Sequence, residues 1–145
     1  MHATFEDVEI GDSLSFGEYE VTREEIRTFA RQYDPQPFHL GPDHEGPFDG
    51  LVASGWHTAA MTMRLLVDNY LSESGAGGSP GLDGLRWPAP VEPGDVLSVT
   101  LTVTSTDGWD ESYGVANLET ETTTADGTTV LWMDALTLYR RADGG

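Results

Sequence analysis

An acid and an imidazole, Asp34 and His39, lie five residues apart in the proline-rich stretch YDPQPFHLGPDHEGPFDGLVASGWHT. Pro35 and Pro37 fix the backbone angle φ on both sides of Gln36, so the path between the acid and the imidazole is stiff. A stiff path holds two reacting groups in place with little loss of entropy when a substrate binds. These residue types suit general acid–base catalysis, in which one group takes a proton from water and another passes a proton on.

The segments around this stretch show the periodicities of regular secondary structure. Strands are predicted at residues 13–21, 82–87, 96–106, 111–124 and 128–141, and helices at residues 22–33 and 54–71. The connection over residues 72–81, rich in glycine and serine, is predicted to be flexible. The last four strands are expected to follow one another in antiparallel succession.

The two helices carry the clearest local signals. Thr22 is a suitable N-cap for the first helix, and Glu25 completes a capping box. The helix over 54–71 is apolar on most of its faces, which predicts that it is buried. One long apolar helix and one sheet with a concave face predict an α+β fold in which an antiparallel sheet wraps around the helix.

The composition favours a single globular domain over residues 1–145. A hydrophobic content of 38% is enough for a core, and the length is too short for two comfortable domains. The chain has no cysteine, which excludes disulfides and thiolate chemistry. The first residues do not have the pattern of a signal peptide, and no apolar run reaches membrane-spanning length, so a cytoplasmic protein is expected.

The charge is strongly acidic, with 25 Asp and Glu residues against seven basic residues and a formal net charge of -18. Such a surface repels nucleic acid and anionic lipid, so neither is expected as a partner. The acids are spread along the chain rather than gathered in a tail. This distribution is typical of halophilic proteins, whose surface charges are screened by abundant salt.

The motif DPQPFH followed by GLVASGWHTAAM resembles the MaoC-like family of hot dog fold proteins, which includes dehydratases and (R)-specific enoyl-CoA hydratases. The family signature is Asp, two residues, Pro, one residue and His, then a helix that opens with His-Gly or Ser-Gly. The later segment LRWPAPVEPGDVL also looks like a family motif. The resemblance implies a hot dog fold and a hydro-lyase that interconverts 2-enoyl-CoA and 3-hydroxyacyl-CoA.

The resemblance also implies roles for individual residues. Asp34 is the base that takes a proton from water, and His39 holds the same water and passes a proton. The backbone N–H of Gly55 is the oxyanion donor, at a helix start where unpaired N–H groups favour negative charge. The implied substrate-binding residues are Phe38, Phe48, Gly50, Leu51, Val52, Ala53, Ser54 and Trp56.

Two positions depart from the commoner family motif. Gln36 stands where Asn is more usual, and Ser54 stands where hydratases often have His. No cofactor is implied, because the acyl group arrives as a thioester of CoA or of a carrier protein. The resemblance further implies a homodimer or a dimer of dimers. An acyl-CoA thioesterase and a non-catalytic acyl-thioester-binding subunit are the alternative functions.

The remaining histidines have simpler explanations. His44 is expected to be a solvated loop residue, and His57 a packed, hydrogen-bonded residue of the buried helix. A metal site formed by His39, His44 and His57 with Asp43 or Glu45 is not expected, because the chain has no helical His-x-x-x-His pair.

Overall fold

The computed structural model describes residues 2–41, 43–44 and 46–143. Its strands are β1 (Ser13–Glu20), β2 (Gly81–Arg86), β3 (Val96–Gly108), β4 (Tyr113–Thr123) and β5 (Thr129–Arg140). Its α-helices are α1 (Arg23–Tyr33) and α2 (Gly55–Asn69). Short 3-10 turns cover η1 (Phe5–Asp7), η2 (Pro37–His39) and η3 (Leu71–Glu73).

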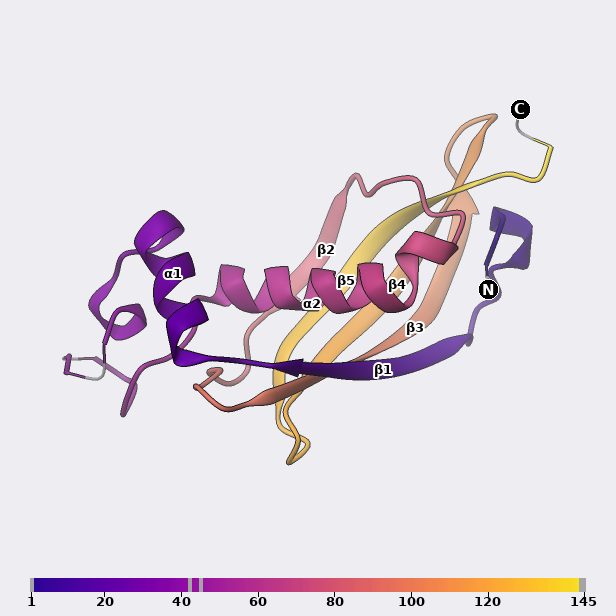
Figure 1. The fold of residues 1–145 in the computed structure, drawn as a ribbon. Coiled ribbons are helices and arrows are strands. Elements are labelled where there is room, and N and C mark those ends of the chain that lie inside the picture. The colour runs from indigo at the N-terminus through magenta and orange to yellow at the C-terminus, as the bar shows by residue number, and fades with distance from the viewer. Residues whose placement is uncertain (1, 42, 45, 144–145) are drawn as a thin grey trace.

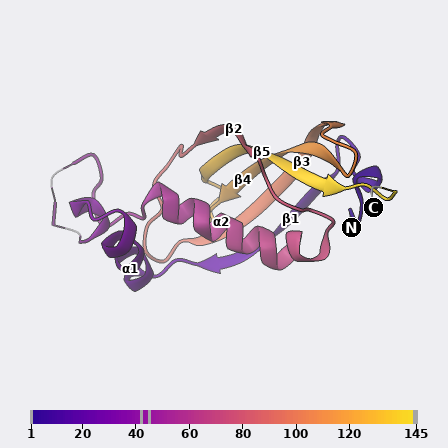
Figure 2. The same cartoon turned by 90° about the horizontal axis from the view of Figure 1, so that it is seen from above.

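One sheet curves around one long helix. The strands form a five-stranded sheet in the order β1-β3-β4-β5-β2, and every pairing is antiparallel. Helix α2 lies along the concave face of this sheet, while α1 and the loop after it lie beyond one end (Figure 1; Figure 2). The structure therefore confirms the predicted α+β arrangement.

The position of β2 corrects the expected succession of the last four strands. β2 pairs with β5 rather than with β3, the next strand along the chain. Between β2 and β3 the chain therefore passes the start of α2, where Trp87 bonds to Gly55 and Val91 to Ala53, and reaches the other side of the sheet. Periodicity within a strand predicts which face is buried, but it does not say which strand lies alongside.

The face of the sheet that contacts α2 is lined by alternate residues. In β3 the predicted apolar positions are all buried: Leu97, Val99, Leu101 and Val103. In β4 the buried positions include two threonines, Thr120 and Thr122, which explains why this strand gave a weaker apolar pattern. The Thr122 hydroxyl is not isolated, because it lies 2.6 Å from the hydroxyl of Thr62 on α2.

Helix α1 begins at its predicted cap, although only half of the capping box forms. The Thr22 hydroxyl accepts a hydrogen bond from the Glu25 backbone N–H at 3.2 Å. The Glu25 carboxylate instead accepts a hydrogen bond from the Tyr19 hydroxyl on β1. Ile26 and Ala30 are fully buried, so this helix is fixed against the core through one face.

The connection over residues 72–81 is not the free linker that its composition predicted. The Gly75 N–H donates to the His2 carbonyl at 2.9 Å, and the Gly77 N–H donates to the Leu138 carbonyl at 2.8 Å. Ala76 also forms a β-bridge with Tyr139. Backbone hydrogen bonds to distant residues therefore hold this segment on the sheet.

Helix α2 is buried on one side only, which corrects the expectation of a fully buried helix. Met61, Leu65 and Leu66 contact the core, whereas Met63 and Val67 are 47% and 40% exposed. An apolar helix face therefore lies open in a single chain. Within the described part of the chain, no helix has both the length and the hydropathy needed to cross a membrane.

Candidate active site

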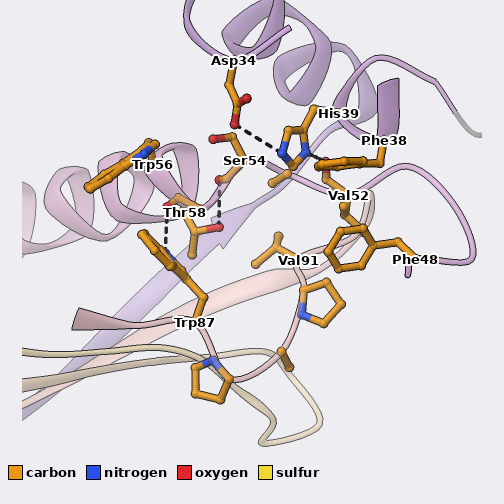
Figure 3. A pocket seen from close by; sticks show the side chains of 15 residues that line it. Asp34, Phe38, His39, Phe48, Val52, Ser54, Trp56, Thr58, Trp87 and Val91 are labelled. Carbon is orange, nitrogen blue, oxygen red and sulfur yellow. Dashed lines mark hydrogen bonds and ion pairs between the residues drawn. The ribbon is translucent and has the colours of Figure 1, made fainter. Parts of the chain in front are cut away.

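A cavity of about 410 Å³ lies where the loop after α1, the start of α2 and the connection from β2 to β3 meet (Figure 3). Asp34 enters it from the C-cap of α1, and His39 from the turn η2. Ser54 and Gly55 enter it from the first turn of α2. The segment over residues 34–39 and the start of α2 therefore supply these polar groups, and the connection from β2 to β3 supplies a largely apolar wall.

Backbone hydrogen bonds join these segments. The Val52 N–H donates to the Phe38 carbonyl at 3.0 Å, which holds the loop against the residues before α2. The Ala53 N–H donates to the Val91 carbonyl at 2.9 Å, which brings in the connection between β2 and β3. The extended residues before α2 thus lie between the two walls of the cavity.

The Asp34 and His39 side chains face each other. Asp34 Oδ2 lies 3.3 Å from His39 Nε2, and both side chains are largely buried. His39 Nδ1 lies 2.7 Å from the Val52 carbonyl oxygen, which is an acceptor only, so Nδ1 carries a proton and donates. In the neutral imidazole, Nε2 then has a lone pair directed at the carboxylate. A molecule that donates two hydrogens, such as water, satisfies both acceptors.

Asp34 is held in its ionised form. Burial alone would raise the pKa of Asp34, but hydrogen bonding from Gln36, the nearby Ser54 hydroxyl and the adjacent His39 together outweigh burial and lower it. The Gln36 contact is short, with Nε2 at 2.6 Å from Asp34 Oδ1. The amide therefore occupies one carboxylate oxygen and leaves the other facing His39.

The first turn of α2 leaves two backbone N–H groups available. The N–H groups of His57 and Thr58 both donate to the Ser54 carbonyl, at 2.9 and 3.0 Å. Among the described residues, none accepts a hydrogen bond from the N–H of Gly55 or Trp56. The positive end of the helix dipole adds to these donors, so an anionic oxygen is stabilised here.

Gly55 is also required for packing. The Trp87 indole N–H donates to the Gly55 carbonyl at 2.9 Å, and the indole ring lies directly over the glycine. A Cβ atom at position 55 would lie 2.6 Å from that ring. The glycine thus permits the close approach of an aromatic side chain, in addition to leaving its own N–H open.

Comparison with known proteins shows the family of this chain. Residues 6–125 match the sequence model of the MaoC like domain family. The chain belongs to the MaoC-like family. A MaoC-like dehydratase from Rhodospirillum rubrum has a similar structure with a TM-score of 0.87 and 35% identity, over 95% of this chain and 97% of that one.

Two further structures share the fold at lower identity. A monoamine oxidase regulatory protein from Archaeoglobus fulgidus has a TM-score of 0.87 and 24% identity, over 98% of this chain and 99% of that one. The R-hydratase PhaJ1 from Pseudomonas aeruginosa has a TM-score of 0.76 and 20% identity, over 97% of this chain and 87% of that one. The predicted hot dog fold is confirmed by these similarities.

Most of the predicted substrate-binding residues of this MaoC-like chain line the cavity. Those that do are Phe38, Phe48, Val52, Ala53, Ser54 and Trp56. Gly50 and Leu51 are not among the lining residues. Leu51 is buried in the hydrophobic core, and the Gly50 carbonyl accepts a hydrogen bond from His44.

The opposite wall of the cavity was missing from the sequence prediction. It consists of Thr58 on α2 and the connection after β2, with Trp87, Pro88, Ala89, Pro90 and Val91. The motif LRWPAPVEPGDVL was recognised as typical of the MaoC-like family, and that was the available signal. Its place beside the Asp34 loop follows only from the crossover between β2 and β3.

His44 differs from its expected role, and His57 matches its expected role in packing but not in hydrogen bonding. His44 is half-buried, with Nε2 at 2.8 Å from the Gly50 carbonyl, so it is not a solvated residue. His57 is buried and stacks on Phe29 at a centroid distance of 4.8 Å, as packing predicted. However, its Nδ1 has no hydrogen-bond partner among the described residues, and its Nε2 lies 3.6 Å from Glu25. Burial lowers the pKa of His57.

Over residues 2–41, 43–44 and 46–143, no group of three or more His, Asp or Glu side chains is placed to hold a metal ion. Glu45, one of the residues considered for a metal site in the sequence, lies outside the described residues.

We expect Gly55→Ala to displace the Trp87 ring, because the added Cβ overlaps it. The loss of the indole hydrogen bond and of packing should lower the free energy of unfolding by about 1–2 kcal/mol. Chemical denaturation followed by circular dichroism measures this change. In a Trp87→Ala background the same Gly55→Ala substitution should cost much less, and an equal cost in both backgrounds would contradict the contact.

Proposed function

We propose that this protein is a hydro-lyase that interconverts 2-enoyl and 3-hydroxyacyl thioesters by reversible addition of water. The observation that carries the proposal is the Asp34–His39 pair, at 3.3 Å, in the same cavity as the open N–H groups of α2. Membership of the MaoC-like family and similarity to a MaoC-like dehydratase support this reaction class.

The proposed reaction starts from a water molecule that donates to Asp34 Oδ2 and His39 Nε2. Its oxygen bonds to the β-carbon while Asp34 takes its proton. The electrons of the double bond move towards the thioester oxygen, which accepts a hydrogen bond from the Gly55 N–H. The proton that Asp34 has taken passes to His39 Nε2, which faces it at 3.3 Å, and His39 gives it to the α-carbon, so that OH is added at the β-carbon, H at the α-carbon, and both side chains return to their starting state.

The walls of the cavity suit an acyl thioester. Phe38, Phe48, Val52 and Val91 provide apolar contacts, with two prolines beside them. The reaction needs no electron transfer, so we propose that no cofactor takes part and that CoA or a carrier protein delivers the acyl group.

Asp34→Asn and His39→Gln should each lower kcat by about 10²-fold or more, because each removes one partner of the attacking water. The assay follows loss of the enoyl ultraviolet absorbance of crotonyl-CoA in molar salt. His44→Gln is the matched control, since His44 lies in the same loop and outside the cavity lining. Circular dichroism confirms that each variant is folded.

Other outcomes would point to other functions. Release of free thiol without loss of the enoyl absorbance would identify a thioesterase. Binding of acyl-CoA without any turnover, unchanged in Asp34→Asn, would identify a non-catalytic acyl-binding subunit. Either result would contradict the proposed reaction.

We also propose that two copies associate through the edge strand β2 and the open face of α2. β2 pairs with β5 on one side only, and its Leu82 is 45% exposed. Met63 and Val67 continue this apolar surface on the helix. Exposed apolar surface beside an open strand edge is typical of an interface.

Val67→Asp should convert such a dimer into a monomer, because it introduces a charge into an apolar interface. Sedimentation velocity in molar salt measures the change. Ile10→Asp is the control, because Ile10 is 66% exposed on a different part of the chain. A wild-type protein that sediments as a monomer at all concentrations would contradict the proposal.

We further propose that the protein works in concentrated salt, on the basis of its net charge of -18. The thermal unfolding temperature should rise with NaCl concentration, because salt screens repulsion among the surface carboxylates. Replacing three exposed acids, Glu9, Glu20 and Glu111, by Gln should make this rise smaller. Calorimetry between dilute buffer and molar NaCl tests both statements, and a temperature independent of salt would contradict them.

A further inference from the structure

The Ser54 hydroxyl is buried without a hydrogen-bond partner. Ser54 is 1% exposed, and its Oγ forms no hydrogen bond of normal geometry with any described residue. Buried hydroxyl groups are nearly always hydrogen-bonded, because an unsatisfied one lowers stability. A buried hydroxyl without a protein partner therefore calls for a specific explanation.

The N-cap position makes this arrangement more unusual. Serine is among the best N-cap residues because its oxygen normally accepts a hydrogen bond from an N–H in the first turn. Ser54 is the N-cap of α2, yet its side chain makes no cap hydrogen bond. Its backbone carbonyl accepts from the His57 and Thr58 N–H groups instead. The hydroxyl is thus available for a different partner.

The cavity is where that partner would lie. Ser54 lines the cavity, and its side chain lies beside Asp34 at the start of α2 (Figure 3). Asp34 Oδ1 is already occupied by the Gln36 amide, so the carboxylate oxygen that faces His39 is the one left for a ligand. Other serine and threonine hydroxyls on this helix are satisfied, as in Thr62, which donates to the Thr58 carbonyl at 2.9 Å.

We propose that Ser54 is a third catalytic residue, whose hydroxyl donates a hydrogen bond to the water that Asp34 and His39 activate. This inference rests on the proposed function. Water has two hydrogens and two lone pairs in a tetrahedral arrangement. Asp34 and His39 accept hydrogen bonds from the two hydrogens of the water, and the Ser54 hydroxyl donates its hydrogen to one lone pair of the water oxygen. The other lone pair of that oxygen remains free, and it is the pair that attacks the β-carbon.

The Ser54 hydroxyl has a second effect on the same site in the free protein. When its one hydrogen is not donated to the water, the hydroxyl is directed towards Asp34 and is one of the influences that lower the pKa of that carboxylate. Removing it should therefore raise that pKa towards its ordinary value. Since the base acts only when ionised, the acid limb of the pH profile of kcat/KM should move to higher pH.

The test compares Ser54→Ala with Ser74→Ala. Ser54→Ala should lower kcat by about tenfold, the effect of one lost transition-state hydrogen bond, with KM nearly unchanged. Its unfolding temperature should be close to that of the wild type, because the hydroxyl has no hydrogen-bond partner among the described residues to lose. Ser74, whose hydroxyl donates to the Leu71 carbonyl at 3.0 Å far from the cavity, should show the opposite pattern: lower stability and unchanged kcat.

Several outcomes would overturn the inference. Full activity and an unshifted pH profile in Ser54→Ala, with Asp34→Asn inactive, would remove Ser54 from the mechanism and leave the proposed function standing. A lower unfolding temperature in Ser54→Ala would show that the hydroxyl has a structural partner. No turnover of any enoyl thioester by the folded wild-type protein would overturn the proposed function, and this inference with it.

Discussion

The hydrogen bond from His39 Nδ1 to the Val52 carbonyl is the contact on which the geometry of the cavity depends. At 2.7 Å it fixes which ring nitrogen carries the proton, and it turns Nε2 towards Asp34. It also joins the proline-rich loop to the extended residues that lead into α2. The same contact therefore determines the tautomer of the imidazole and the distance between the loop and the helix start.

Much of this arrangement could be predicted from local sequence. The Asp34-Pro35 pair marked the end of the first helix, and the alternation at Leu97 and Val99 identified a buried strand. The fold followed because one apolar helix and one sheet have few ways to cover each other. These features depend on residues close together in the chain, which is why periodicity and composition reveal them.

Other features depend on contacts between distant residues and were not predicted. The wall formed by Pro88 to Val91 reaches the cavity because the Ala53 N–H bonds to the Val91 carbonyl. The strand β4 looked weak because Thr122, a polar residue, is buried against Thr62. Whether the Ser54 hydroxyl forms a hydrogen bond depends on the rotamer of its side chain, and sequence patterns do not predict rotamers.

The contact between Trp87 and Gly55 links the end of the edge strand β2 to the start of helix α2. Trp87 directly follows the last residue of the edge strand β2, and its indole is bonded to the first residue of α2. A displacement of Trp87 at the end of β2 would therefore disturb the first turn of α2, where the open N–H groups of Gly55 and Trp56 lie. The exposed edge of the sheet and the wall of the cavity are thus connected through a single side chain.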